Sequence, residues 1–227
     1  MTQAEFAQIE RFMQASMQDA VHDQLHVYRV LNYALQIAEA TPGADMDVVI
    51  ISALLHDIGR AAEMRDPSLC HARVGSQMAH EFLLARGDQA DVARRVADCI
   101  RTHRYKNGVP PQSPEARILF DADKLDLIGT VGVARAILFG GQIDEPLYRL
   151  DAQNDPTEGL PSEGASLFRE YNRKLSSLWT KLYTAKAREI AKAQQKTMDA
   201  YFQSLFQEVK TNHKAGQAIL NRVLTPK

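Results

Sequence analysis

His56 and Asp57 stand side by side at the end of an apolar stretch, residues 48–58. Burying an imidazole or a carboxylate without a partner costs free energy, and a bare carboxylate costs the most. A metal ion removes that cost, because it binds imidazole nitrogen and carboxylate oxygen together. The pair therefore indicates a metal site, for which His26 upstream and Asp123 downstream are candidate co-ligands.

Two histidines and two aspartates offer nitrogen and oxygen donors without thiolate. That donor set favours Mn, Fe, Co, Ni or Zn over Ca or Mg. Four protein ligands leave positions open for water and a substrate phosphate, as metal-assisted hydrolysis requires. We expect one ion, because the sequence carries one such His-Asp pair and no further acid cluster near it. In that reaction Asp57 would also orient the attacking water.

The elements that position these residues are predicted to be helices almost throughout, because apolar residues recur every three or four positions. His26 lies in the first turn of a helix for which Asp23 is the expected N-cap. Asp123 lies in a largely apolar helix that starts at Ser113-Pro114. The helices are expected over these ranges: 3–18, 23–40, 46–58, 71–85, 89–103, 113–129 and 184–210.

The connections carry the glycines and prolines. We predict that residues 59–70 form a loop with one turn. Residues 129–141 form a segment interrupted by glycines. Residues 144–162 are predicted to be a long surface loop, which is a candidate lid. Gly87 is the expected helix stop and Asp88 the next N-cap. The sequence predicts an all-α protein with one domain over residues 1–227. Its core spans about residues 20–140, with a C-terminal helical extension over about residues 162–215.

Composition narrows the function classes. The 227 residues carry a net charge of −1, so the protein has no overall positive electrostatic field that would attract nucleic acid or an anionic membrane. The 2 cysteines are too few for a disulfide framework or a thiolate zinc site. No secretory signal and no membrane-spanning run is evident, which predicts a soluble cytoplasmic protein. The long 184–210 helix suits either core packing or a dimer arm, so both a monomer and a homodimer are open.

The order His26, His56-Asp57, Asp123 resembles that of the HD-domain metal-dependent phosphohydrolases, which are all-α enzymes. The longer motifs are similar to one bacterial subgroup of nucleotide pyrophosphohydrolases, which act on nucleoside or deoxynucleoside triphosphates with Mn. The resemblance covers roughly residues 20–210. The matching segments are these: His22-Asp23-x-x-His26-x-x-Arg29-Val30, Ala53 to Gly59, His71-x-x-x-Gly75, Ile100-x-x-His103, Asp121 to Gly129, Gly132-x-x-Arg135 and, more loosely, Lys174 to Thr184.

Carried over by position, the resemblance implies His26, His56, Asp57 and Asp123 as metal ligands. It implies His71 and His103 as catalytic residues that contact phosphate oxygens and offset their developing charge. Four further residues are candidates for the surroundings of the substrate: Asp126 as a supporting acid, and Arg135, Arg60 and Lys174 as phosphate contacts. Ion pairs or surface positions are the ordinary alternatives for these four.

Two differences from the motifs of related hydrolases bear on which substrate this chain would use. The acidic pair that follows the His-Asp in (p)ppGpp hydrolases is absent, as is the Gly-Tyr-Pro motif of cyclic dinucleotide hydrolases. The subgroup often has a histidine near the position at which this chain has Glu170. If this region contacts the nucleotide, the acid in place of the histidine can change the substrate preference. Release of pyrophosphate from a triphosphate is therefore the leading hypothesis. A phosphomonoesterase or phosphodiesterase and a non-catalytic nucleotide or metal sensor are the alternatives.

Overall fold

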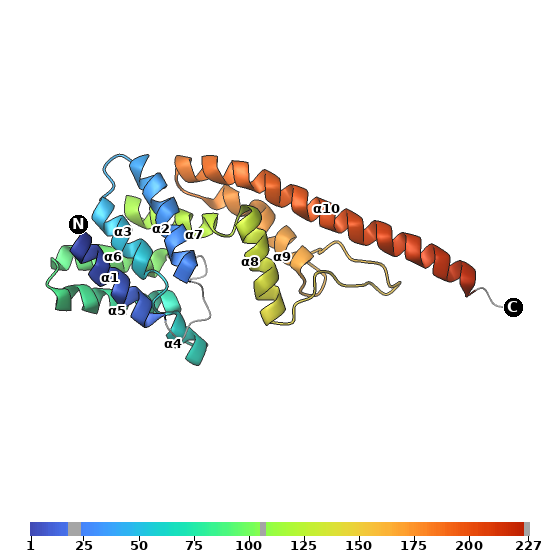
Figure 1. The fold of residues 1–227 in the computed structure, drawn as a ribbon, viewed down its shortest axis with the longest axis horizontal. Coiled ribbons are helices and arrows are strands. Elements are labelled where there is room, and N and C mark those ends of the chain that lie inside the picture. The colour runs from blue at the N-terminus through green and yellow to red at the C-terminus, as the bar shows by residue number, and fades with distance from the viewer. Residues whose placement is uncertain (18–23, 105–107, 225–227) are drawn as a thin grey trace. The chain divides into compact units, whose positions relative to one another are not determined.

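The computed structural model describes residues 1–17, 24–104 and 108–224 (Figure 1). Within these ranges the regular structure is helical, and the one β-type pairing is an isolated bridge between Leu150 and Pro156. The prediction of an all-α protein is confirmed. Among the described helices, none is long and apolar enough to cross a membrane.

The chain divides into two compact units. The first comprises Met1–Asp126 and Leu182–Glu189, and the second comprises Leu127–Lys181 and Ile190–Lys227. The helix α10 (Ala185–Val223) contributes to both. A single domain over residues 1–227, with the core and extension given above, stays a prediction.

The first unit is built around α3 (Met46–Leu55), which is buried on nearly every side, as its composition predicts. It packs against four neighbouring helices, and α5 and α6 pack against each other. The other helices of this unit are α1 (Gln3–Ser16), α2 (Gln24–Glu39), α4 (Arg60–Arg65), α5 (His71–Arg86), α6 (Ala90–Thr102) and α7 (Pro114–Leu125).

Local signals place most helix ends within a few residues, but α10 extends to Val223, beyond the predicted end at residue 210. Further corrections concern Asp88 and residues 59–70. Gly87 ends α5 in the left-handed conformation, with φ of 93°, as predicted. Asp88 is not the next N-cap, because its carboxylate pairs with Arg86 at 2.6 Å and Gln89 takes the cap position. The predicted loop 59–70 contains the short helix α4. Asp23, the expected cap of α2, lies outside the described residues.

The start of α7 follows the predicted signal. Ser113 accepts a hydrogen bond from the backbone N–H of Ala116, and Pro114 opens the helix. Glu115 is buried, where it accepts hydrogen bonds from the Asp45 backbone N–H at 3.0 Å and from Arg95 at 3.1 Å. This acid therefore ties the start of α7 to the start of α3. The helix ends at Leu125, short of the expected Gly129.

In the second unit, the glycine-punctuated segment forms a helix, α8 (Gly129–Gln142). Gly132 serves close packing, because a Cβ there would lie 2.3 Å from the Leu127 carbonyl. The unit also contains α9 (Leu167–Arg173) and the 3-10 helix Leu175–Lys181. Its core comprises Val133, Leu167, Phe168, Leu175, Met198 and Phe202. Residues 144–162 contain no helix, and their use as a lid stays a prediction.

Candidate metal centre

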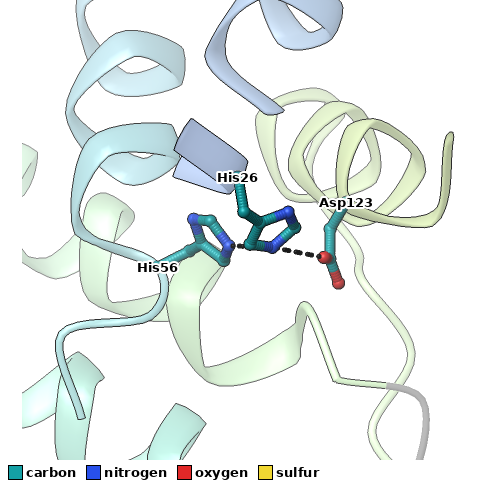
Figure 2. Close-up of side chains that lie close together, drawn as sticks. All are labelled: His26, His56 and Asp123. Carbon is teal, nitrogen blue, oxygen red and sulfur yellow. Dashed lines mark hydrogen bonds and ion pairs between the residues drawn. The ribbon is translucent and has the colours of Figure 1, made fainter. Parts of the chain in front are cut away.

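His26, His56 and Asp123 come together from three different helices of the first unit (Figure 2). His26 lies in the first turn of α2, His56 follows the last residue of α3, and Asp123 lies in the last turn of α7. Nε2 of His26 is 3.4 Å from Nε2 of His56 and 3.4 Å from Oδ1 of Asp123. Two ligands on one ion lie about 3 to 3.5 Å apart when each bond is about 2.1 Å long.

Asp57 lies beside this group and also faces a second one. Its Oδ2 is 3.8 Å from Nε2 of His26 and 3.7 Å from Nε2 of His56. Its Oδ1 is 3.5 Å from Nε2 of His71 and 3.7 Å from Nε2 of His103. Asp57, His71 and His103 therefore form a second set of side chains that can hold a metal ion.

The orientation of each imidazole is fixed through its Nδ1. Nδ1 of His56 lies 2.8 Å from the Ala53 carbonyl oxygen, and Nδ1 of His103 lies 2.6 Å from that of Ile100. A carbonyl oxygen only accepts, so each Nδ1 must carry the proton. His26 and His71 direct Nδ1 at carboxylates instead: Asp126 at 2.7 Å and Glu63 at 2.6 Å.

It follows that, in the neutral state, all four imidazoles present a bare Nε2 to the centre. The Nε2 atoms of His26 and His56 are 3.4 Å apart, and those of His71 and His103 are also 3.4 Å apart. Two lone pairs facing each other at this distance repel unless a cation or a proton lies between them. Metal-binding histidines carry the same arrangement, in which the other ring nitrogen donates to a carboxylate or a carbonyl.

Asp57 gives a second test of whether these residues fit a metal ion. Its Oδ1 is buried and has no hydrogen-bond donor among the residues that the structure describes. Arg60 approaches it as an ion-pair partner, with Nε at 3.1 Å. A buried carboxylate oxygen that lacks a donor is costly, and coordination to a divalent ion would compensate it. The donor set and this oxygen therefore both fit a divalent metal.

Each carboxylate around the centre has a cationic partner from the protein. These pairs are Asp126–Arg29, Asp57–Arg60, Glu63–Arg104 and Asp123–Lys124. With the histidines neutral, these opposite charges balance one another. A divalent ion would therefore leave the centre with a positive charge, which suits an anionic ligand.

The pKa shifts agree with a centre of neutral imidazoles and ionised acids. Burial lowers the pKa of His56 to about 4, and burial together with Arg60 lowers that of His71 to about 4. Burial alone would raise the pKa of Asp57, but the positive charges of His56, when it is protonated, and of Arg60 hold it well below the usual range. Against the same burial, the Lys124 ammonium keeps the pKa of Asp123 well below the usual range.

The four residues that were predicted to surround the substrate lie in different units: two in the first and two in the second. Arg60 lies at the centre beside Asp57, whereas Asp126 lies behind His26, where it is buried and paired with Arg29. Arg135 lies on α8 and Lys174 directly follows α9, where it pairs with Glu170 at 2.9 Å. Both belong to the second unit, and their contact with phosphate stays a prediction.

Sequence reasoning missed Glu63, Lys124 and Arg104 as parts of the centre. Lys124 donates to Asp123 at 2.5 Å and to the His103 carbonyl at 3.0 Å, so it links the two sets of candidate metal ligands. Its position directly after Asp123 was an available signal. Glu63 lies within the predicted loop 59–70, and Arg104 directly follows the predicted helix 89–103. Nothing in the local pattern distinguishes either residue from a surface charge.

The chain is similar to known proteins over most of its length. A family model described as the HD domain matches residues 25–128. The YpgQ protein of Bacillus subtilis is 28% identical over 208 residues, which cover 89% of this chain and 92% of that protein.

Solved structures show the same likeness over most of the chain. The crystal structure of Bacillus subtilis YpgQ in complex with ADP matches with a TM-score of 0.70 and 30% identity, over 91% of this chain and 95% of that one. A predicted HD superfamily hydrolase from an uncultured Thermotogales bacterium matches with a TM-score of 0.60 and 27% identity, over 91% and 92% of the two chains.

Proposed function

Because this chain belongs to the HD-domain phosphohydrolase superfamily, we propose that it hydrolyses nucleoside or deoxynucleoside triphosphates to the monophosphate and pyrophosphate. We propose a divalent ion, with Mn first among Mn, Fe, Co, Ni, Zn and Mg, held by His26, His56, Asp57 and Asp123. The protein would act in the cytoplasm as a monomer or homodimer.

One observation carries the proposal: bare imidazole nitrogens and the donor-less Asp57 oxygen converge on one buried centre. Two further facts support a nucleotide as the substrate. The pairing of each acid with a protein cation means that bound metal would leave a positive site for polyphosphate. The related YpgQ protein binds ADP in its crystal structure.

A divalent ion bound here supplies Lewis-acid chemistry, because it lowers the pKa of a bound water and polarises a phosphate oxygen. The chain itself contributes orientation. Asp57 faces both histidine groups, so its carboxylate can accept a hydrogen bond from the attacking water and fix its direction. Arg60, about one-third exposed beside Asp57, can bind a phosphate oxygen.

His71 and His103 have two possible roles. To donate a hydrogen bond to a phosphate oxygen, each needs a proton on Nε2 in addition to the one on Nδ1. Alternatively, both remain neutral and hold a second ion together with Oδ1 of Asp57. The facing Nε2 atoms at 3.4 Å favour the second role over the single ion expected from the sequence.

The test is a nucleotide panel assayed with Mn, Co, Ni, Zn and Mg, with products identified by phosphorus NMR and bound metal counted by mass spectrometry. Pyrophosphate and a nucleoside monophosphate are the expected products from triphosphates. Inorganic phosphate as the sole released product would replace the proposal with a phosphomonoesterase, and opening of a diester would indicate a phosphodiesterase. A metal-loaded protein without turnover on any nucleotide would indicate a sensor.

A further inference from the structure

We propose that Glu63, held in place by Arg104, is a positioning residue that fixes the proton of His71 on Nδ1. The inference rests on the proposed metal-dependent function, because His71 matters there through its bare Nε2. Nothing in the sequence pattern points to Glu63, which lies on the short helix α4 in a segment predicted as a loop.

The contacts of Glu63 leave little freedom to its carboxylate. Its Oε2 lies 2.6 Å from Nδ1 of His71, and its Oε1 accepts a hydrogen bond from Arg104 at 2.5 Å. Arg60 lies 3.6 Å from the Oε2 oxygen. Each carboxylate oxygen therefore has its own partner, and the ionised acid can only accept the His71 proton, not supply one.

The same arrangement recurs at the other metal-binding group. Asp126 accepts a hydrogen bond from Nδ1 of His26 at 2.7 Å, and Nε of Arg29 donates to that acid at 2.7 Å. Each group thus combines one histidine tied to a carboxylate–arginine pair with one tied to a backbone carbonyl. Because Asp126–Arg29 and Glu63–Arg104 come from unrelated segments, the repetition indicates a shared requirement at the two histidines.

The requirement follows from what His71 would do without Glu63. A neutral imidazole that loses its Nδ1 acceptor can carry the proton on Nε2 instead. Nε2 lies 3.5 Å from the donor-less Oδ1 of Asp57, so a proton there would move toward a hydrogen bond with that oxygen. Such a bond would occupy the same two atoms that a metal ion needs. Glu63 prevents it by keeping the proton on the far side of the ring.

The expected effect is therefore on metal binding as well as on turnover. Removing a carboxylate that orients a metal-binding histidine typically lowers metal affinity or activity by about 10- to 100-fold. Glu63→Ala should show a loss of this size in Mn affinity and in kcat. Glu63→Gln should lose less, because the amide oxygen can still accept the His71 proton although it no longer pairs with the Arg104 charge.

The decisive measurement is the tautomer of His71 in the full-length, metal-free protein, read by long-range proton–nitrogen NMR of the imidazoles. We expect the Nδ1–H form in the wild type and in Glu63→Gln, and the Nε2–H form in Glu63→Ala. His26, His56 and His103 should keep their signals in all variants. Calorimetric titration with Mn gives the affinity of each variant, and Glu189→Gln on the exposed start of α10 controls for the loss of a surface acid.

If Glu63→Ala keeps the Nδ1–H form of His71 and wild-type Mn affinity, the inference is wrong. Should that variant fail to fold, Arg104→Gln loosens the same carboxylate without removing it, and unchanged Mn affinity there would also overturn the inference. Neither readout uses a nucleotide. A chain that binds Mn in the expected order of variants but hydrolyses no triphosphate would refute the proposed function alone.

Discussion

Asp126 accepts a hydrogen bond from Nδ1 of His26 at 2.7 Å, although the two residues are 100 positions apart in the sequence. Arg29, one turn after His26 on the same helix, holds both oxygens of this acid, at 2.7 and 3.1 Å. The end of α7 is thereby fixed against the start of α2 by a buried charged network. Asp123 lies one turn earlier on α7, so the same contact sets its distance from His26.

Asp126→Asn should weaken Mn binding by about 10- to 100-fold, because the uncharged amide loses the Arg29 ion pair and orients His26 less firmly. Titration calorimetry on the full chain gives the affinity. Asp91→Asn on the exposed face of α6 is the matched control, since that acid forms an exposed pair with the surface arginine Arg94. Equal Mn affinity in both variants would show that Asp126 does not support a metal ligand.

Asp57→Ala should remove both the bound metal and the turnover, because Asp57 faces both histidine groups. Metal content by mass spectrometry and product formation from a triphosphate are the two measurements. Circular dichroism checks that the variant is folded. An Asp57→Ala protein that turns over substrate without metal would contradict the metal-dependent mechanism.

How much of this centre the sequence predicts depends on how far apart along the chain the interacting residues lie. His26, His56, Asp57 and Asp123 were predicted from their residue types as candidate ligands, and the structure brings His26, His56 and Asp123 close enough together to hold one ion. The supporting contacts were not predicted, since helical periodicity reports which face of a helix is buried and not which distant residue lies opposite. Glu63 shows this most clearly, because its partners lie eight positions ahead, at His71, and far along the chain, at Arg104.

The helix α8 shows a similar limit within the fold. Its glycines were interpreted as breaks, because glycine lowers helix propensity by about 1 kcal/mol relative to alanine. In the second unit, Gly132 lies against the Leu127 carbonyl and the Met198 side chain, where a Cβ would collide at 2.3 Å with the carbonyl. Tertiary packing thus decides the conformation of a segment for which the local signal points the other way.

Gly59→Ala should destabilise the fold by about 3 kcal/mol, at the upper end of the cost of overpacking. An added Cβ would lie 2.2 Å from the His71 carbonyl oxygen and 2.6 Å from the Gly75 backbone nitrogen, so α5 and the segment after Asp57 must separate. Urea denaturation gives the free energy of unfolding, and Mn titration should show a parallel loss because His71 moves with α5. Gly141→Ala, on α8 with open space around the added Cβ, should be neutral or stabilising. Equal stability of the two variants would contradict the close packing at Gly59.

The stability of the metal-free protein should fall as the pH is lowered from about 6.5 toward 4. The pKa values of His56 and His71 are about 4 in the folded protein, below the ordinary value of 6.5. Between these values the unfolded chain binds more protons than the folded one, so protons favour unfolding there, and above this window the effect disappears. Each shift corresponds to about 3 kcal/mol at roughly 1.4 kcal/mol per pKa unit. The lowered pKa values of Asp57 and Asp123 act in the same direction, but only below pH 4.

Urea denaturation of chelator-treated protein between pH 8 and pH 4.5 provides the measurement. The unfolding midpoint should stay level down to about pH 6.5, the ordinary pKa of histidine, and then decline. In His56→Gln the decline should be shallower, because one of the two depressed histidines no longer titrates. Added Mn should raise the midpoint near neutral pH and lose this effect as protons compete for the imidazoles. A midpoint that rises on acidification would mean that the buried histidines are already protonated in the folded state, and the neutral metal-binding centre would have to be abandoned.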